Sequence, residues 1–140
     1  MTYSDNSNES LVKVRDVMMD QYAIVEGVIT VAEAVRIAKQ RQIKALIVNK
    51  RHDDDEYGIV LMNDIAKKVL ALDRSPERTN IYEIMTKPAL SVNASMDVRY
   101  CARLFERFGI SRAPVIEGGE IKGMVSYNNI VLNGMLREEQ

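Results

Sequence analysis

Apolar positions along this chain alternate between a helical period and short continuous runs. After Thr30, apolar residues recur at i, i+3, i+4 and i+7, and Glu33 follows Thr30 at the spacing of a capping box. The segment 45–48 is apolar throughout, which is typical of a strand buried on both faces. The pattern therefore predicts a helix that begins after Thr30, followed by a buried strand at 45–48.

Shorter elements are expected on either side of this pair. The pattern predicts one or two helical turns at 14–19, strands at 23–25 and 57–61, and a helix capped by Asn63 or Asp64 that runs to about residue 72. Two polar segments separate these elements, namely the charged loop 49–56 and the proline-containing linker 73–80.

A second copy of this plan follows the linker. Residues 81–85 match 14–18 at an offset of 67, which also places the apolar helix face of 31–38 on 98–105. After the loop, Gly58 matches Gly123 at an offset of 65. A two-residue change of length inside a surface loop is well tolerated. The chain is therefore a tandem repeat of one supersecondary unit, and each copy is small for a stable core of its own.

The second copy contains a clear hairpin signal. Gly109 is placed to end a helix, and apolar strands flank the pair Gly118-Gly119, which suits a two-residue turn. The second strand of this hairpin leads through Ser126 into a further helix. The order of elements in the first copy is thus expected again in the second.

Composition limits the functions that such a chain can carry. With 19 basic and 20 acidic residues the net charge is −1, so the overall basic charge typical of nucleic-acid-binding proteins is lacking. One Cys and one His cannot supply an intrachain disulfide or a zinc site of the usual kind. No apolar run approaches the length of a membrane span, and the polar N-terminus lacks a signal-peptide core. We therefore expect a cytoplasmic protein without a membrane or nucleic-acid partner.

Two groups of reactive residue types have simple structural interpretations. Residues 52–56 form a contiguous His-Asp-Asp-Asp-Glu run without the glycine-containing spacing of a calcium loop, so we interpret them as a solvated loop without metal ligands. Cys101 lies on an apolar helix face and is expected to be a small core residue. No nucleophile–base pair is apparent, so no catalytic residue is predicted.

The order of elements and two sequence segments resemble the CBS (cystathionine-β-synthase-type) domain, which occurs in tandem pairs. The segments are Arg112-Ala113-Pro114-Val115 and Gly123-Met124-Val125-Ser126-x-x-Asn129-Ile130. The resemblance implies an α+β fold, a Bateman-type module of tandem CBS repeats with two small sheets flanked by helices and pseudo-two-fold symmetry. The expected divisions are a flexible tail at 1–10, repeat 1 at 11–72, a linker at 73–80 and repeat 2 at 81–137.

The resemblance also implies a function. Members of this family bind adenosine-containing ligands (AMP, ADP, ATP or S-adenosylmethionine) in clefts between repeats, usually regulate an attached enzyme, channel or transporter, and commonly pair as dimers. No other domain is attached here, so we expect a stand-alone, non-enzymatic regulatory module that forms a homodimer, requires no cofactor and signals to a partner protein. The alternative is an interaction module that has lost ligand binding and acts through its surfaces alone.

Neither repeat carries the complete family motif Gly-x-x-[Ser/Thr]-x-x-Asp, in which the hydroxyl contacts phosphate or ribose and the carboxylate binds the ribose hydroxyls. Repeat 1 has Leu61 and Asp64 at these two positions, and repeat 2 has Ser126 and Asn129. Loss of an ionic hydrogen bond costs roughly 1.5–3 kcal/mol, or about ten- to a hundredfold in affinity. Both clefts are therefore expected to bind nucleotide in a weakened or altered manner.

Further ligand-binding residues follow from the resemblance. Residues before the hairpin line the adenine pocket and place a cation near phosphate, and Thr86 matches a position that closes the base pocket. The expected ligand-binding set is Lys44, Ala45, Asp64, Thr86, Arg112, Ala113, Pro114, Ser126 and Asn129. Structural roles also suit several of them, because Asp64, Ser126 and Asn129 fit helix caps, whereas Lys44 and Arg112 fit surface charges.

Overall fold

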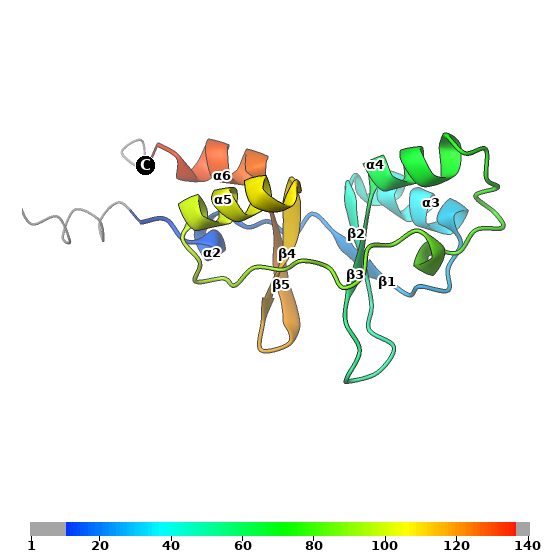
Figure 1. The fold of residues 1–140 in the computed structure, drawn as a ribbon, viewed down its shortest axis with the longest axis horizontal. Helices are drawn as coiled ribbons and strands as arrows, with labels where there is room; N and C mark the ends of the chain where they lie inside the picture. Colours follow the sequence, from blue (N-terminus) through cyan, green and yellow to red (C-terminus); the bar gives the residue numbers. More distant parts are fainter. Residues whose placement is uncertain (1–10, 137–140) are drawn as a thin grey trace, which may run out of the picture. The chain divides into compact units, whose positions relative to one another are not determined.

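The computed structural model of this protein describes residues 11–136, and the tail expected at 1–10 lies outside the described residues. The chain divides into two compact units. One unit contains residues 21–90, and the other combines 11–20 with 91–136. Each unit holds one small sheet with helices against it (Figure 1), so the expected α+β class with two small sheets is confirmed.

The unit of residues 21–90 is built on a three-stranded sheet. Strands β1 (Ala23–Val25) and β2 (Ala45–Val48) are parallel, and α3 (Val31–Arg41) connects them. Strand β3 (Gly58–Leu61) is antiparallel to β2, which gives the order β1-β2-β3. Three short helical segments follow, namely α4 (Met62–Ile65), the π-helix η1 (Ala66–Leu70) and the 3₁₀ helix η2 (Ile81–Glu83). The strands expected at 23–25 and 45–48 are confirmed.

The core of this unit lies between the helices and one face of the sheet. Because side chains alternate along a strand, Leu46 and Val48 share the face that Ile47 does not. The buried cluster contains Ala23, Val25, Val31, Ala34, Ala38, Ile43, Leu46, Val48, Val60, Val69, Ile81 and Ile84. The predicted helix face is therefore largely correct, except that Val35 remains 39% exposed.

A capping box marks the start of α3, and a residue with left-handed backbone conformation marks its end. The Thr30 Oγ1 accepts a hydrogen bond from the Glu33 N–H at 3.1 Å, and the Glu33 carboxylate accepts one from the Thr30 N–H at 3.1 Å. The predicted capping box is thus confirmed. At the other end, Gln42 adopts a left-handed conformation with φ of 55°. Glycine adopts this conformation more readily than glutamine, because it has no Cβ.

The start of α4 differs from the prediction that Asn63 or Asp64 would cap the helix. Leu61 is the N-cap residue, with extended φ of −103°, and Asp64 is the third helical residue. The Asp64 carboxylate instead reaches back to accept a hydrogen bond from the Leu61 N–H at 2.8 Å. Asp64 therefore satisfies a backbone donor at the helix start, although it is not the N-cap residue.

The unit formed by 11–20 and 91–136 contains a two-stranded sheet. Strands β4 (Arg112–Glu117) and β5 (Glu120–Ser126) form an antiparallel hairpin. Gly118 and Gly119 turn the hairpin with φ of 61° and 80°, the positive values that such a two-residue turn requires. The helices of this unit are α2 (Val14–Val17), α5 (Val98–Phe108) and α6 (Tyr127–Gly134). The predicted glycine hairpin is confirmed.

The first strand of the second repeat is reduced to a single bridge. The repeat alignment pairs Val25 with Val92, yet Val92 forms only an isolated parallel bridge with Val115. The chain turns directly afterwards, because the Asn93 side chain accepts hydrogen bonds from the Ser95 N–H at 2.9 Å and from the Ser95 hydroxyl at 2.7 Å. The second sheet therefore has two strands where the first has three.

A second buried cluster lies between α2, α5, α6 and the β4–β5 hairpin. It contains Val12, Val14, Val17, Val92, Ala94, Val98, Cys101, Phe105, Ala113, Val115, Val125 and Ile130. Cys101 is fully buried, as predicted for a small core residue. Burial raises the pKa of its thiol to about 11, since the thiolate is poorly solvated there.

Each unit receives a methionine from the segment that begins the other sequence repeat. A Cβ placed on Gly58 would meet the Met85 Sδ at 2.7 Å, and one placed on Gly123 would meet the Met18 Sδ at 2.9 Å. The two glycines, equivalent under the repeat, are thus needed for close approach of these side chains. The compact units and the sequence repeats are different divisions of the same chain, because 11–20 and 81–90 each pack with the opposite repeat.

None of the helices within residues 11–136 combines the length and the apolar content that crossing a bilayer would require.

Candidate functional site

The junction of β5 and α6 holds Ser126 and Asn129 in one hydrogen-bonded pair. The Ser126 Oγ accepts from the Asn129 N–H at 3.2 Å and donates to the Asn129 Oδ1 at 3.1 Å. The same Oδ1 accepts from the Ser126 N–H at 3.0 Å. Both side chains therefore cap α6, as their sequence positions allow. The Asn129 Nδ2 forms no hydrogen bond within the described residues, so it can donate to a ligand.

The strand beside this junction brings three more expected residues close to it. Arg112 is the direct cross-strand partner of Ser126, and its side chain is half-buried. Ala113 and Pro114 follow it along β4 and are buried. Because the Ala113 side chain belongs to the core cluster, any contact of this residue with a ligand would be made by its backbone. Five of the nine expected residues thus gather in this unit.

The corresponding junction of β3 and α4 gathers three residues of the first repeat. Ala45 is the cross-strand partner of Leu61, and the Lys44 carbonyl accepts a hydrogen bond from the Met62 N–H at 3.2 Å. Asp64 lies one turn into the helix and is half-buried. This junction has the geometry of its counterpart, but the half-exposed side chain of Leu61 stands where the other repeat has a hydroxyl.

Thr86 lies in the same unit as the first-repeat residues. It exchanges two backbone hydrogen bonds with Ile59 of β3, each 2.9 Å long, and its side chain is exposed. By sequence it aligns with the second repeat, yet it packs in the unit of residues 21–90. The structure thus places Lys44, Ala45, Asp64 and Thr86 in one unit and the other five expected residues in the other.

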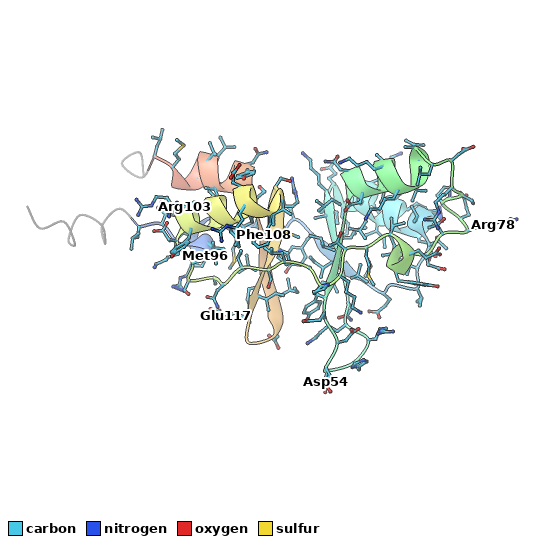
Figure 2. All side chains as sticks on the ribbon, viewed as in Figure 1. Asp54, Arg78, Met96, Arg103, Phe108 and Glu117 are labelled. Atoms are coloured by element: carbon cyan, nitrogen blue, oxygen red, sulfur yellow. The ribbon has the colours of Figure 1, made fainter. Side chains whose placement is uncertain are left out.

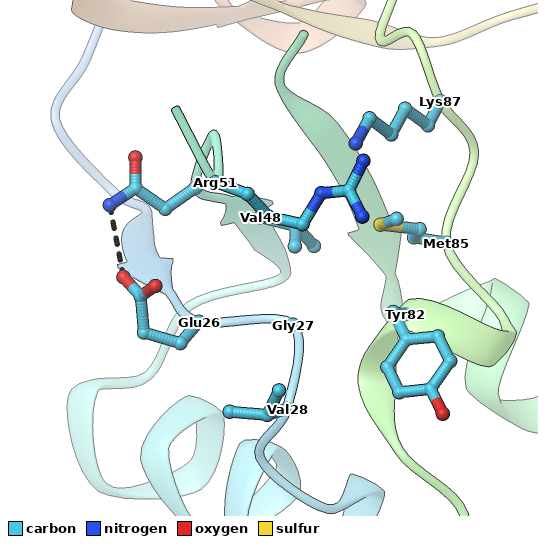
Figure 3. Close-up of a pocket in the computed structure, with 9 residues that line it drawn as sticks. Glu26, Gly27, Val28, Val48, Arg51, Tyr82, Met85 and Lys87 are labelled. Atoms are coloured by element: carbon cyan, nitrogen blue, oxygen red, sulfur yellow. Dashed lines mark hydrogen bonds between the residues drawn. The ribbon is translucent and has the colours of Figure 1, made fainter. Parts of the chain in front are cut away.

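A pocket that none of the expected residues lines opens in the unit of residues 21–90 (Figure 3). Its volume is about 410 Å³. We call it the Tyr82 pocket, and its lining residues are Glu26, Gly27, Val28, Val48, Asn49, Arg51, Tyr82, Met85 and Lys87. Most of the wall is apolar, with charged groups at separate places. Such a combination is typical of small-molecule sites.

The cations of this pocket are held by one carboxylate in the β2–β3 loop. Asp55 accepts from the Lys87 Nζ at 2.8 Å and from the Arg51 Nε at 3.2 Å. The Lys87 ammonium, followed by the Arg51 backbone N–H, keeps the pKa of Asp55 well below its ordinary value. The side chain of Asp55 is only 8% exposed, so the interpretation of this acidic run as a solvated loop is wrong for Asp55.

The sequence offers no signal for the Tyr82 pocket, because its walls come from separate segments. Glu26 to Val28 follow β1, Asn49 and Arg51 follow β2, and Tyr82, Met85 and Lys87 belong to the segment after the linker. The charged residues of 49–56 indicated a loop, and 81–85 indicated only a repeated helical turn. Within the described residues, no group of three or more His, Cys, Asp or Glu side chains is arranged to hold a metal ion.

Comparison with known proteins identifies the repeated unit. The family model described as CBS domain matches residues 14–71 and 81–133. The CBS domain-containing protein YhcV from Bacillus subtilis is 27% identical over 125 residues, which cover 89% of this chain and 87% of that protein.

Solved structures agree with this match. The hexameric CBS-CP12 protein from bloom-forming cyanobacteria is 38% identical, with a TM-score of 0.87 over 91% of this chain and 74% of that chain. The CBS domain pair of protein MJ0100, solved in complex with 5′-methylthioadenosine and S-adenosyl-L-methionine, is 25% identical, with a TM-score of 0.75 over 87% of this chain and 94% of that chain.

Proposed function

This chain belongs to the CBS domain family, and on that premise we propose that it is a regulatory module that binds an adenosine-containing ligand and signals the bound state to a partner protein. The candidate ligands are AMP, ADP, ATP and S-adenosylmethionine. A related CBS pair of 25% identity binds 5′-methylthioadenosine and S-adenosyl-L-methionine, which supports this ligand class.

The observation that carries the proposal is the polar cluster at the β5–α6 junction. Ser126 and Asn129 are fixed by their mutual hydrogen bonds, and Arg112 stands directly across the strand pair from Ser126. The Arg112 guanidinium has no ion-pair partner within the described residues. An amide donor, a hydroxyl and an unpaired cation together suit a ribose and a phosphate or carboxylate.

Regulation requires that the ligand bind two arrangements of the protein with unequal affinity, because a ligand of equal affinity shifts no equilibrium. The ligand-binding residues proposed for this role are Arg112, Ala113, Pro114, Ser126 and Asn129 in one unit, with Lys44, Ala45, Asp64 and Thr86 in the unit of residues 21–90. No group among them is a nucleophile activated by a base, so the proposed role is regulatory and not catalytic.

Calorimetric titration with AMP, ADP, ATP and S-adenosylmethionine tests this proposal, together with melting temperatures measured at millimolar ligand. Asn129→Asp restores the carboxylate of the family motif, and we expect it to tighten binding of a ribose-containing ligand about tenfold. Asn128→Asp is the matched control, because it adds the same charge in the same helical turn at an exposed position. Absence of binding heat and of a melting shift in both wild type and Asn129→Asp would refute the proposal.

A specific observation favours a second candidate, an interaction module without a ligand. The Ser126 hydroxyl and the Asn129 Oδ1 already bond to each other, and the Leu61 side chain cannot hydrogen-bond a phosphate. In that case the melting temperature is unchanged by AMP, ADP, ATP and S-adenosylmethionine. A partner recovered with this protein would then bind equally with and without them.

We further propose that the chain forms a homodimer. Several apolar side chains around the end of α6 are exposed, namely Val131, Leu132, Met135 and Leu136. Phe108, labelled in Figure 2, is exposed at the end of α5. The cyanobacterial relative is hexameric, which supports self-association. Native mass spectrometry reports the oligomeric mass, and Leu132→Glu is expected to lower it because a charge would enter the apolar contact.

A further inference from the structure

We propose that the Tyr82 pocket is a separate ligand site, which takes a flat organic anion carrying a hydrogen-bond donor at the end opposite its acidic group. The volume of about 410 Å³ is large enough for a ligand of one or two rings. All the lining residues belong to the unit of residues 21–90, so the pocket is complete within that unit.

Two apolar side chains in the wall of this pocket are largely exposed to solvent. Val28 is 73% exposed and Tyr82 is 53% exposed, although both line the cavity. Val48 and Met85 lie deeper, where Val48 is buried and Met85 is half-buried. A flat body inserted between these residues would remove apolar surface of Val28 and Tyr82 from water, which favours binding.

The acidic group of the ligand would lie against Arg51 and Lys87, whose charged ends stand side by side in Figure 3. Within the described residues these two cations share one carboxylate, that of Asp55, so one positive charge is left uncompensated. The Arg51 side chain is 77% exposed, so it can turn toward a ligand by exchanging its contact with the Asp55 carboxylate for one with the acidic group. Guanidinium and ammonium groups bind both phosphate and carboxylate.

The second polar part of the pocket is formed by Glu26 and Asn49. It favours a hydrogen-bond donor on the ligand and disfavours a second acidic group. The Asn49 Nδ2 donates to the Glu26 carboxylate at 2.9 Å, and the Asn49 Oδ1 accepts from the Lys50 N–H at 2.9 Å. These two bonds fix the Asn49 amide, and the Glu26 carboxylate beside it is a negatively charged hydrogen-bond acceptor. An amino group on the ligand would be accepted there, whereas a second acidic group would be repelled.

The pocket is independent of the site proposed above, because none of the nine proposed adenosine-binding residues lines it. Two probes represent the two sources of the acidic group. AMP carries a phosphate and 4-aminobenzoate carries a carboxylate, and each has an amino group on a flat ring system. Adenosine serves as the uncharged control for AMP.

The test is methyl NMR of protein labelled at methionine and valine methyl groups. We expect at least one probe to shift the signals of Met85, Val28 and Val48, and adenosine to bind about tenfold more weakly than AMP if AMP is the better probe. Arg51→Gln is expected to weaken the better probe about tenfold, and its exposed position protects the fold. Asp55→Asn is expected to strengthen it several-fold, since Asp55 competes with the ligand for both cations.

The outcomes separate the two sites. The inference would be overturned if neither probe, at millimolar concentration, shifted the signals of Met85, Val28 and Val48. This holds whatever calorimetry shows for the β5–α6 junction. Shifts that persist unchanged in Arg51→Gln and Lys87→Gln would also overturn it, because the anion would then lie elsewhere. Signal shifts that these two variants abolish and that Arg112→Gln leaves unchanged would establish the Tyr82 pocket as a ligand site. That conclusion would hold even if the β5–α6 junction bound no ligand.

Discussion

Asp55 is the single residue whose charge has the clearest energetic consequence. Its pKa is lowered in the folded state by Lys87 and Arg51, so its stabilising contribution is present above the unfolded-state pKa of about 3.9 and is lost as the pH falls below that value. We therefore expect Asp55→Asn to melt below wild type at pH 7, and the difference to shrink progressively below about pH 4. Thermal melts followed by circular dichroism across this range measure the difference.

Asp54→Asn is the control for that prediction. Asp54 is exposed at the tip of the same loop (Figure 2), so the substitution removes the same charge without breaking the contact with Lys87. Its melting temperature should follow wild type at every pH. A loss of stability in Asp55→Asn that is independent of pH would show that packing, and not the ion pair, is responsible.

Cys101 provides a second prediction at this scale. It is fully buried, and burial raises its thiol pKa to about 11, so very little thiolate exists at pH 8 and reagents cannot reach it. We expect no reaction with Ellman's reagent in native protein at pH 8, and release of one equivalent per chain in guanidinium chloride, since the chain has one Cys. Rapid native reaction would mean that the core around α5 opens readily.

The helix ends show how far sequence reasoning reaches at the scale of elements. The start of α3 could be predicted because Thr30 and Glu33 carry the capping interaction themselves. The start of α4 was predicted wrongly, because Asp64 has the composition of an N-cap but bonds backward to the Leu61 N–H from inside the helix. Side-chain preference identifies which residues can satisfy a helix end, while the direction of the incoming strand decides which one does.

The C-termini of α3 and α5 form a matched pair for an element-scale prediction. Gln42 and Gly109 occupy equivalent positions in the repeat and both are left-handed, with φ of 55° and 65°. No atom lies within 4 Å of a Cβ built on Gly109, so Gly109→Ala adds backbone strain without a clash. We expect Gly109→Ala to lower the unfolding free energy by about 1 kcal/mol and Gln42→Gly to raise it by about 0.5 kcal/mol.

Chemical denaturation of the two variants measures these changes. Gly109→Asn provides a control, because asparagine tolerates the left-handed region better than alanine and should cost less. Equal losses in Gly109→Ala and Gly109→Asn would indicate that contacts of the side chain, and not its backbone conformation, determine the effect.

At the scale of the whole molecule, the repeat could be recognised from the sequence but the pairing of its parts could not. Residues 14–18 and 81–85 have equivalent patterns, so no sequence feature indicates whether each packs with its own repeat or with the other. In the structure each packs with the other repeat, because the Met18 side chain lies against Gly123 and the Met85 side chain lies against Gly58. The Tyr82 pocket could not be predicted for the same reason. Met85 and Lys87 line it only because the segment 81–90 packs with the opposite repeat.

Because residues 11–20 pack with the second repeat, we predict that this N-terminal segment stabilises it. Val14 is fully buried in the cluster of α5 and β4, and its N–H donates to the Met96 carbonyl at 2.8 Å. Val14→Ala should therefore lower stability by roughly 2 kcal/mol, and this loss should appear in residues 91–136 and not in 21–90. Native-state hydrogen exchange at Phe105 and Val125, compared with Leu46 and Val60, locates the effect.

Arg15→Ala is the control for this last prediction, because Arg15 is the exposed neighbour of Val14 in the same helix. It should leave amide protection in both units close to wild type. If Val14→Ala weakened protection at Leu46 and Val60 as much as at Phe105 and Val125, the two units would unfold as one cooperative body. Selective loss at Phe105 and Val125 would instead mean that 11–20 is part of the second folding unit, so a fragment that begins at residue 81 lacks part of its own core.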